Sequence, residues 1–191
     1  MPQRTPSRLV LAWTLTALTA VPAFAQTNGS PKRYTAVAMD LDRGQTARLQ
    51  LTVNRWSTEA QRAQLMSTML EKGPDALLET LQKQPTVGTI QVDQGLGWDL
   101  RFAWRTPGED GGERIILATD RPMSFWEVSN RPRTVDYPFT IIELHVKNGE
   151  GDGTLSLATK VIPDKDRKVI VLENFDTQRI RLTQVRAART Q

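Results

Sequence analysis

The residue types that usually carry chemistry are scarce in this chain of 191 residues, which has one histidine and no cysteine. The absence of cysteine excludes disulfides, iron–sulfur clusters, thiolate zinc sites and cysteine nucleophiles. A single histidine, His145, excludes every metal motif that needs two. His145 lies in a predicted strand with alternating polar neighbours, so we interpret it as an exposed strand residue rather than a catalytic base. Phosphate-binding glycine loops and nucleophilic-serine motifs are also absent from the sequence.

Carboxylates remain as candidates for acid–base chemistry. Asp40 with Asp42, Glu143, and Glu173 with Asp176 could pair in space as the two carboxylates of a glycosidase do. Aspartates beside turns more commonly accept hydrogen bonds from the turn backbone. The sequence therefore assigns no catalytic residue and favours a non-catalytic protein.

The acidic, glycine-rich stretch 148–153 offers oxygen ligands of the kind that Ca²⁺ prefers. It lacks the bidentate glutamate that ends the twelve-residue EF-hand loop. We interpret it as a hairpin turn, and the sequence predicts no metal site and no cofactor.

The stretch best suited to recognition runs from Asp120 to Glu143. Its prolines at positions 122, 132 and 138 prevent a continuous helix or a central strand. Arginine and aromatic side chains are enriched in binding hot spots. We therefore predict a binding surface formed by Arg121, Phe125, Trp126, Arg131, Arg133, Asp136 and Tyr137. In the alternative interpretation, Phe125 and Trp126 plug one end of the sheet, and Arg131 or Arg133 pairs with Asp136 or Glu127.

The C-terminal part of the chain is basic. From Lys160 onward there are eight basic and four acidic residues, and Arg179 and Arg181 alternate with apolar residues. Such a face suits an anionic polymer of the cell envelope. Charged residues also protect the edge strands of sheets from aggregation, which is the alternative interpretation.

The first 25 residues have the pattern of a secretory signal peptide. Arg4 and Arg8 precede a short apolar run, and Ala23-Phe24-Ala25 has the form of a cleavage site before Gln26. The apolar run is about ten residues long, whereas a membrane-spanning helix needs about 20. We predict an exported protein, periplasmic or secreted, that is soluble after cleavage.

Removal of this leader lowers the formal net charge from +4 to +2, because the leader carries two arginines and no acidic residue. A charge of +2 gives no general electrostatic reason to expect nucleic-acid binding. No stretch after residue 25 is apolar for long enough to form a transmembrane segment. We expect a flexible tail at 26–32 and one β-rich domain at 33–187.

Within this domain, the predicted strands 33–41 and 48–54 form a first β-hairpin, because apolar and polar residues alternate along them. A helical hairpin follows at about 57–84. Ser57 or Thr58 can cap it, Gln61 completes a capping box, and Gly73-Pro74 separates the two helices.

Strands then resume to the end of the chain, at 86–92, 98–105, 114–119, 139–147, 154–162, 168–173 and 179–185. Short connections between neighbouring strands favour antiparallel pairing. The predicted fold class is α+β: a mostly antiparallel sheet, curled into a sandwich or partial barrel, with one helical hairpin inserted after the first β-hairpin.

Three segments carry a resemblance to a family. The sequences ATDRPMSFWE at 118–127, NRPRTVDYPFTIIEL at 130–144 and ENFDTQRIRLTQV at 173–185 resemble a group of uncharacterised exported bacterial proteins. The resemblance extends from about the first hairpin to Val185. It implies a single exported domain in the bacterial envelope and says nothing about mechanism.

Three functional hypotheses follow. The first is a non-catalytic domain that binds an envelope partner or small ligand through Asp120–Glu143. The second is a carrier of a small apolar molecule, held between the curled sheet and the helical hairpin. The third is a carboxylate-dependent hydrolase. A cavity lined by leucine and methionine would favour the carrier, and two carboxylates converging in a cleft would favour the hydrolase.

The signal-peptide pattern makes a direct prediction about the mature N-terminus. N-terminal sequencing of the protein purified from its own cells should begin at Gln26 or within a few residues of it. Recovery of the chain with Met1 intact in the membrane fraction would contradict export with cleavage.

Overall fold

The computed structural model describes residues 31–40, 44–93, 95, 97–108, 110–120, 139–164, 169–174 and 180–188, with the backbone alone at 157–164 and 169–174. The described residues form ten strands and two helices. Their bounds are β1 Lys32–Asp40, β2 Gln45–Val53, α1 Glu59–Lys72, α2 Pro74–Gln82, β3 Gly88–Val92, β4 Gly97–Leu100, β5 Phe102–Pro107, β6 Glu113–Thr119, β7 Phe139–Lys147, β8 Glu150–Asp164, β9 Val169–Asn174 and β10 Ile180–Ala187.

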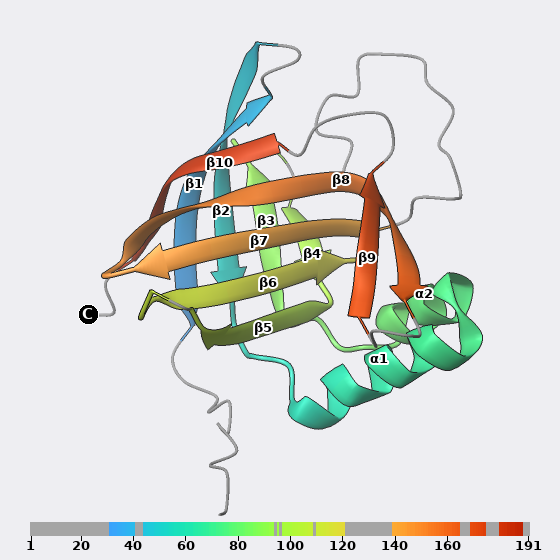
Figure 1. Ribbon diagram of the computed structural model, residues 1–191. Helices are drawn as coiled ribbons and strands as arrows, with labels where there is room; N and C mark the ends of the chain where they lie inside the picture. Colours follow the sequence, from blue (N-terminus) through green and yellow to red (C-terminus); the bar gives the residue numbers. More distant parts are fainter. Residues whose placement is uncertain are drawn as a thin grey trace, which may run out of the picture.

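All these strands belong to one antiparallel sheet. Its order is β4-β3-β2-β1-β10-β8-β7-β6-β5, and β9 pairs with β8 beside this path. The sheet curls so that β5 to β8 run across β1 to β4, as Figure 1 shows. The predicted α+β class is confirmed, and of the two predicted arrangements the nearly barrel-shaped one is observed.

The two ends of this strand order meet at Arg101. β4 ends at Leu100 and β5 begins at Phe102, so one bent segment pairs first with β3 and then with β6. Around the bend, the amide of Arg101 donates to the carbonyl of Ala118 at 2.9 Å. The sequence predicted one strand at 98–105. The prediction missed this bend because both halves share the same alternating pattern, although they pair with different partners.

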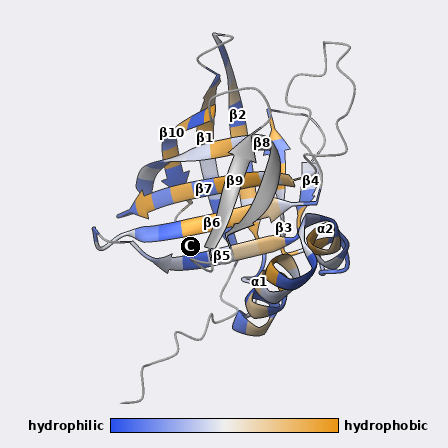
Figure 2. Ribbon diagram, turned by 45° about the vertical axis from the view of Figure 1, so that its right-hand side comes forward, coloured by the Kyte–Doolittle hydropathy of each residue, from blue (hydrophilic) through white to orange (hydrophobic). Residues whose placement is uncertain are grey.

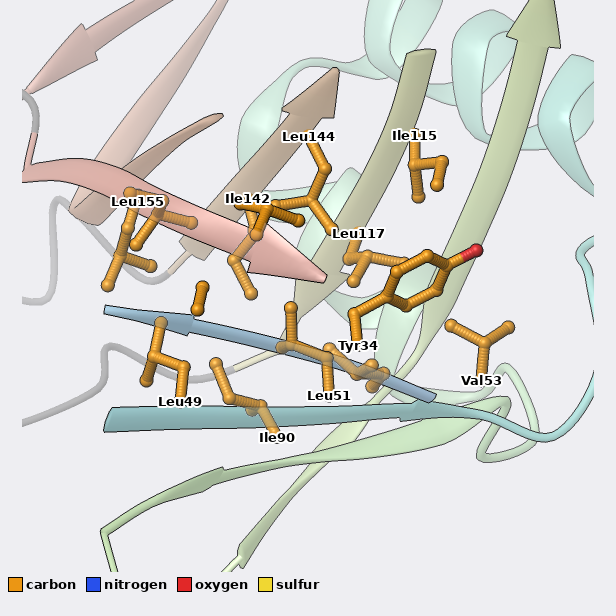
Figure 3. Packing of buried hydrophobic residues seen from close by; sticks show 14 of the residues in the cluster. Tyr34, Leu49, Leu51, Val53, Ile90, Ile115, Leu117, Ile142, Leu144 and Leu155 are labelled. Atoms are coloured by element: carbon orange, nitrogen blue, oxygen red, sulfur yellow. The ribbon is translucent and has the colours of Figure 1, made fainter. Parts of the chain in front are cut away.

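The interior of the curled sheet is apolar. Residues that point inward come from both halves of the strand order and form one cluster, part of which Figure 3 shows. Burying one leucine or isoleucine side chain contributes roughly 1.5–3 kcal/mol. The interior side chains without exposed surface include Leu49, Leu51, Ile90, Leu100, Ile115, Leu117, Ile142, Leu144, Leu155 and Leu182.

The helical hairpin packs on the outer face of the sheet. Thr58 caps α1 in the predicted capping box, in which its hydroxyl accepts from the amide of Gln61 and its own amide donates to the Gln61 side chain. Gly73 separates the helices with φ of 89°, in the left-handed region that glycine adopts without strain. The buried side chains of this second cluster are Leu65, Met69, Leu77, Leu81 and Phe139.

Ser57 has a different role from the predicted cap. Its amide donates to the carbonyl of Ala103 at 2.8 Å, and its hydroxyl accepts from the amide of Ala103 at 3.1 Å. The chain between β2 and α1 therefore covers part of the free edge of β5. This position has no periodic signal in the sequence, because the contact joins residues that lie 46 positions apart.

Several predicted boundaries differ from the structure by one to four residues, and two of these differences follow from strand pairing and from the turn. Lys32 belongs to β1 rather than to the flexible tail, because it pairs with Val53 of β2. β8 begins at Glu150, four residues before the predicted start, since the turn occupies only Asn148 and Gly149. The predicted signal peptide at 1–25 and residues 26–30 of the tail lie outside the described residues.

Truncation of the α2 core residues tests this packing. Leu77→Ala and Leu81→Ala should each lower the free energy of unfolding by about 2–5 kcal/mol, because each leaves a cavity between helix and sheet. Urea titrations measure the change. Glu79→Ala on the exposed face of α2 is the matched control, with an expected effect within about 0.5 kcal/mol. Losses below half a kcal/mol for both leucines would mean that the hairpin does not pack on the sheet.

Candidate binding surfaces

The predicted binding residues themselves lie outside the described part of the chain. Arg121, Phe125, Trp126, Arg131, Arg133, Asp136 and Tyr137 all fall within 121–138. The structure describes both flanks of this segment. Thr119 at the end of β6 faces Thr140 near the start of β7, so the segment leaves and re-enters the sheet on neighbouring strands. The aromatic residue at the C-terminal flank, Phe139, is buried against the helical hairpin.

The N-terminal flank is held by Arg101. The Arg101 guanidinium places Nε 3.5 Å from Oδ2 of Asp120 and Nη2 3.4 Å from Oδ2 of Asp99. Its Nη1 donates to the carbonyl of Gln84 at 3.3 Å and to the hydroxyl of Thr86 at 3.1 Å. Because Asp120 is only 9% exposed, this ion pair is better shielded than a surface pair. The sequence analysis did not single out Arg101, since its partners come from three separate parts of the chain.

A charged cluster occupies the outer face of β6 and β7. Oε1 of Glu143 accepts from Nε of Arg114 at 2.6 Å and lies 3.0 Å from Nε2 of His145. Burial raises the pKa of Glu143, but the hydrogen bonds from Arg114 and His145 outweigh it, so the pKa lies below its usual value. Glu143 is therefore ionised at neutral pH. A general acid needs the opposite shift.

His145 is exposed on β7, as its alternating neighbours predicted. On the adjacent strands it faces Arg114 of β6 and Asp152 of β8. The arrangement therefore supplies a hydrogen-bond partner for Glu143 rather than a nucleophile–base pair.

The other carboxylate pairs cannot be assembled from the described residues. Asp40 ends β1, while Asp42, Asp176 and the side chain of Glu173 lie outside the described part. The layer between sheet and helical hairpin, where a carrier would hold its ligand, contains one cluster of mutually packed side chains, each at most 8% exposed. The carrier hypothesis gains no support from that layer.

Trp56, from the connection between β2 and α1, belongs to the buried cluster inside the curled sheet. Trp56 is 6% exposed, and the Arg105 guanidinium lies 5.0 Å from its ring centroid. Arg105 also lies 3.4 Å from Oε1 of Glu113. Burial, followed by the nearby Glu113 charge, raises the pKa of Tyr34 to about 12. The connection between β2 and α1 therefore adds an aromatic side chain to the core, and no periodic pattern in the sequence predicts it.

The acidic stretch 148–153 contains the tight turn between β7 and β8, and its residues from Glu150 onward belong to β8. Asn148 and Gly149 have φ values of 54° and 86°, the left-handed pair that a two-residue hairpin turn requires. A Cβ at Gly151 or Gly153 would collide with a carbonyl oxygen of β7, so close strand approach explains these glycines. Among the described residues, no group of three or more histidine, aspartate or glutamate side chains is placed to hold a metal ion.

The basic strand β10 is not an edge strand. It lies inside the sheet, between β1 and β8. Protection of an edge therefore does not explain Arg181 and Arg186, which point outward between buried residues. Figure 2 shows hydrophilic and hydrophobic residues alternating along this strand and its neighbours β1 and β2.

Comparisons with protein-family models, with curated proteins and with solved structures found no match for this chain. The resemblance to exported bacterial proteins therefore stays a prediction. Among the residues that the structure describes, no helix has the length and apolar character that crossing a bilayer requires.

The ion pairs of Glu143 predict a pH-dependent stability. The pKa of Glu143 is lower in the folded chain than in the unfolded chain. The contribution of ionised Glu143 to the free energy of unfolding is therefore complete above the unfolded pKa of about 4.3, and it is lost as the pH falls through the folded pKa. Glu143→Gln should therefore destabilise the protein at pH 7, and its difference from wild type should shrink below about pH 4. Urea titrations across this range measure it, with Glu79→Gln on α2 as control. A difference that stays constant down to pH 3 would contradict the prediction.

Proposed function

We propose that this protein is an exported, non-catalytic binding domain of the bacterial envelope, which contacts its partner or ligand through the segment between β6 and β7. Export is supported by the leader pattern of residues 1–25 and by the family resemblance. The described residues support the binding role through the way in which this segment is connected to the sheet.

One observation carries the proposal. β6 ends at Thr119 and β7 begins at Phe139, so 19 residues connect two strands that are already paired at Thr119 and Thr140. Two to five residues are enough to connect such a hairpin. Connections longer than about 12–15 residues in compact domains are uncommon and usually functional or disordered. The additional residues here include three arginines and three aromatic side chains.

Both described flanks of the segment are anchored to the domain. Asp120 pairs with Arg101 at the bend that joins the sheet ends, and Phe139 packs against both helices. Anchors on rigid elements reduce the entropy that a recognition segment loses on binding. The two anchoring residues differ from the side chains proposed to contact the partner, so contact residues can be substituted without removing an anchor.

The sheet interior gives less support to the other two hypotheses. Its inward-facing positions carry packed leucine and isoleucine side chains, and Glu143, the best-defined carboxylate, is ionised and paired on the outer face. A carrier needs an open apolar cavity and an acid–base hydrolase needs a protonated acid, so the binding role is the one we retain.

A double variant tests the binding role. Arg131→Ala combined with Arg133→Ala should change stability by less than about 1 kcal/mol per residue, as exposed charges do. It should also reduce capture of the partner from native envelope extract at least tenfold, measured by quantitative mass spectrometry. Lys72→Ala combined with Lys83→Ala, on the helical hairpin, is the charge-matched control.

Trp126→Ala separates binding from plugging. A plug would lose about 3–5 kcal/mol of stability, as buried aromatic truncations do, whereas a contact residue would lose capture with little change in the thermal melt. Unchanged capture by the arginine double variant, together with a large stability loss for Trp126→Ala, would overturn the binding role of the segment.

A further inference from the structure

Four arginines gather on the outer face of the three adjacent strands β2, β1 and β10. We name this surface the arginine face and define it by Arg33, Arg48, Arg181 and Arg186. Each of the four is exposed and alternates with buried residues, so each points away from the core. The strands are neighbours in the sheet although β10 is separated from β1 by more than a hundred residues.

The strand register arranges the four arginines at regular levels along β1. Arg186 faces Thr35 and Arg181 faces Met39 across the β1–β10 pairing, while Arg48 faces Val37 across the β1–β2 pairing. Arg33 belongs to β1 itself. The four arginines therefore lie beside positions 33, 35, 37 and 39 of β1. A strand rises about 3.4 Å per residue, so successive charges are offset by about 7 Å along β1.

Within the ranges of β1, β2 and β10 that carry the four arginines, the charged side chains are all positive. The ranges 33–39, 45–53 and 180–187 contain no aspartate or glutamate. Among the described residues, Arg33, Arg48 and Arg181 form no ion pair, and Arg186 forms an exposed one, 3.8 Å from Glu150. Nearby carboxylates lie at the border: Asp40 ends β1, and Asp93 accepts from the backbone amide of Arg48.

The outer face of β6 and β7 shows the contrast. There, Arg114 and His145 meet Glu143, and Lys147 lies 3.9 Å from Asp110. An ordinary solvated surface mixes both signs in this way. On the arginine face, carboxylates lie only at the border, where Glu150 is beside Arg186 and Asp93 is beside Arg48. Because β10 lies inside the sheet, its charges do not serve to protect an edge.

We propose that the arginine face binds a linear acidic polysaccharide, one that carries a carboxylate on each repeating unit. Guanidinium groups bind carboxylates through paired hydrogen bonds, and charges at regular levels along β1 suit a polymer with regular charges. Between the arginines lie Thr35, Gln50, Thr183 and Gln184, whose hydroxyls and amides match the hydroxyl groups of sugars.

The same face fits other polyanions less well. Its outward positions carry no aromatic side chain, whereas proteins that bind single-stranded nucleic acid stack bases on aromatic rings. A stable protein partner would need a desolvated apolar centre, and here the apolar outward residues are only the half-buried Val37 and Met39 of β1. This inference uses a different surface from the segment between β6 and β7, so either proposal can fail without the other.

Fluorescence anisotropy with labelled polygalacturonate tests the proposal, using the full chain. Wild type should bind polygalacturonate at low salt, and binding should weaken steeply as salt rises, because counterions compete with the arginines. Loss of one exposed charge should weaken binding about two- to fivefold. Arg48→Gln combined with Arg181→Gln should therefore weaken it about four- to 25-fold. The control, Lys72→Gln combined with Lys83→Gln, removes the same charge from the helical hairpin and should change affinity less than twofold.

Two further arms make the result decisive. Fully methyl-esterified polygalacturonate removes the carboxylates and keeps the sugar chain, so it should not bind. Tighter binding of an oligothymidylate of equal charge would assign the face to nucleic acid instead. The proposal is overturned by no polygalacturonate binding, by equal losses in both double variants, or by equal affinity for the methyl ester. A thermal melt of each variant confirms that the sheet stays folded.

Discussion

The fold depends on the bend at Arg101, where the two ends of the sheet become one continuous segment. β4 and β5 are the outermost strands of the order, yet one residue joins them, so the sheet is held in its curled form by the chain itself. The backbone of Arg101 pairs with β6, and its side chain binds groups from the connection between α2 and β3, from β4 and from the residue that follows β6. The closed apolar interior follows from this curling, because only a curled sheet buries one face without a second layer.

Curling also decides which outer surfaces are available. The helical hairpin covers the outer face near the start of β7, where Phe139 and the leucines of both helices exclude water. Within the described part of the chain, no helix covers the outer face of β1, β2 and β10, which lies away from the hairpin in Figure 1. Because the described inward-facing side chains pack against one another, we expect binding surfaces on the outside and in the connections between strands. The two surfaces that we propose are of these two kinds.

The two surfaces differ in their physical basis. The segment between β6 and β7 is a long connection with fixed ends, and its aromatic and arginine side chains suit a compact contact. The arginine face is a rigid surface whose charges are set by strand register, and it suits an extended polymer. Around Glu143, acidic and basic side chains meet on the sheet, whereas on the arginine face carboxylates lie only at the border.

The sequence by itself determined the local elements and the fold class. Alternation at Leu49, Leu51 and Val53 predicted β2, the Thr58–Gln61 capping box began α1, and short connections predicted antiparallel pairing, since each depends on residues close in the chain. Only the tertiary structure decided the strand order, the bend at Arg101, the burial of Trp56, and the place of β10 inside the sheet. These features join residues that are far apart in sequence. Periodicity shows which face of a strand is buried, but not which strand lies beside it, because strand pairing is made by backbone groups that every residue shares.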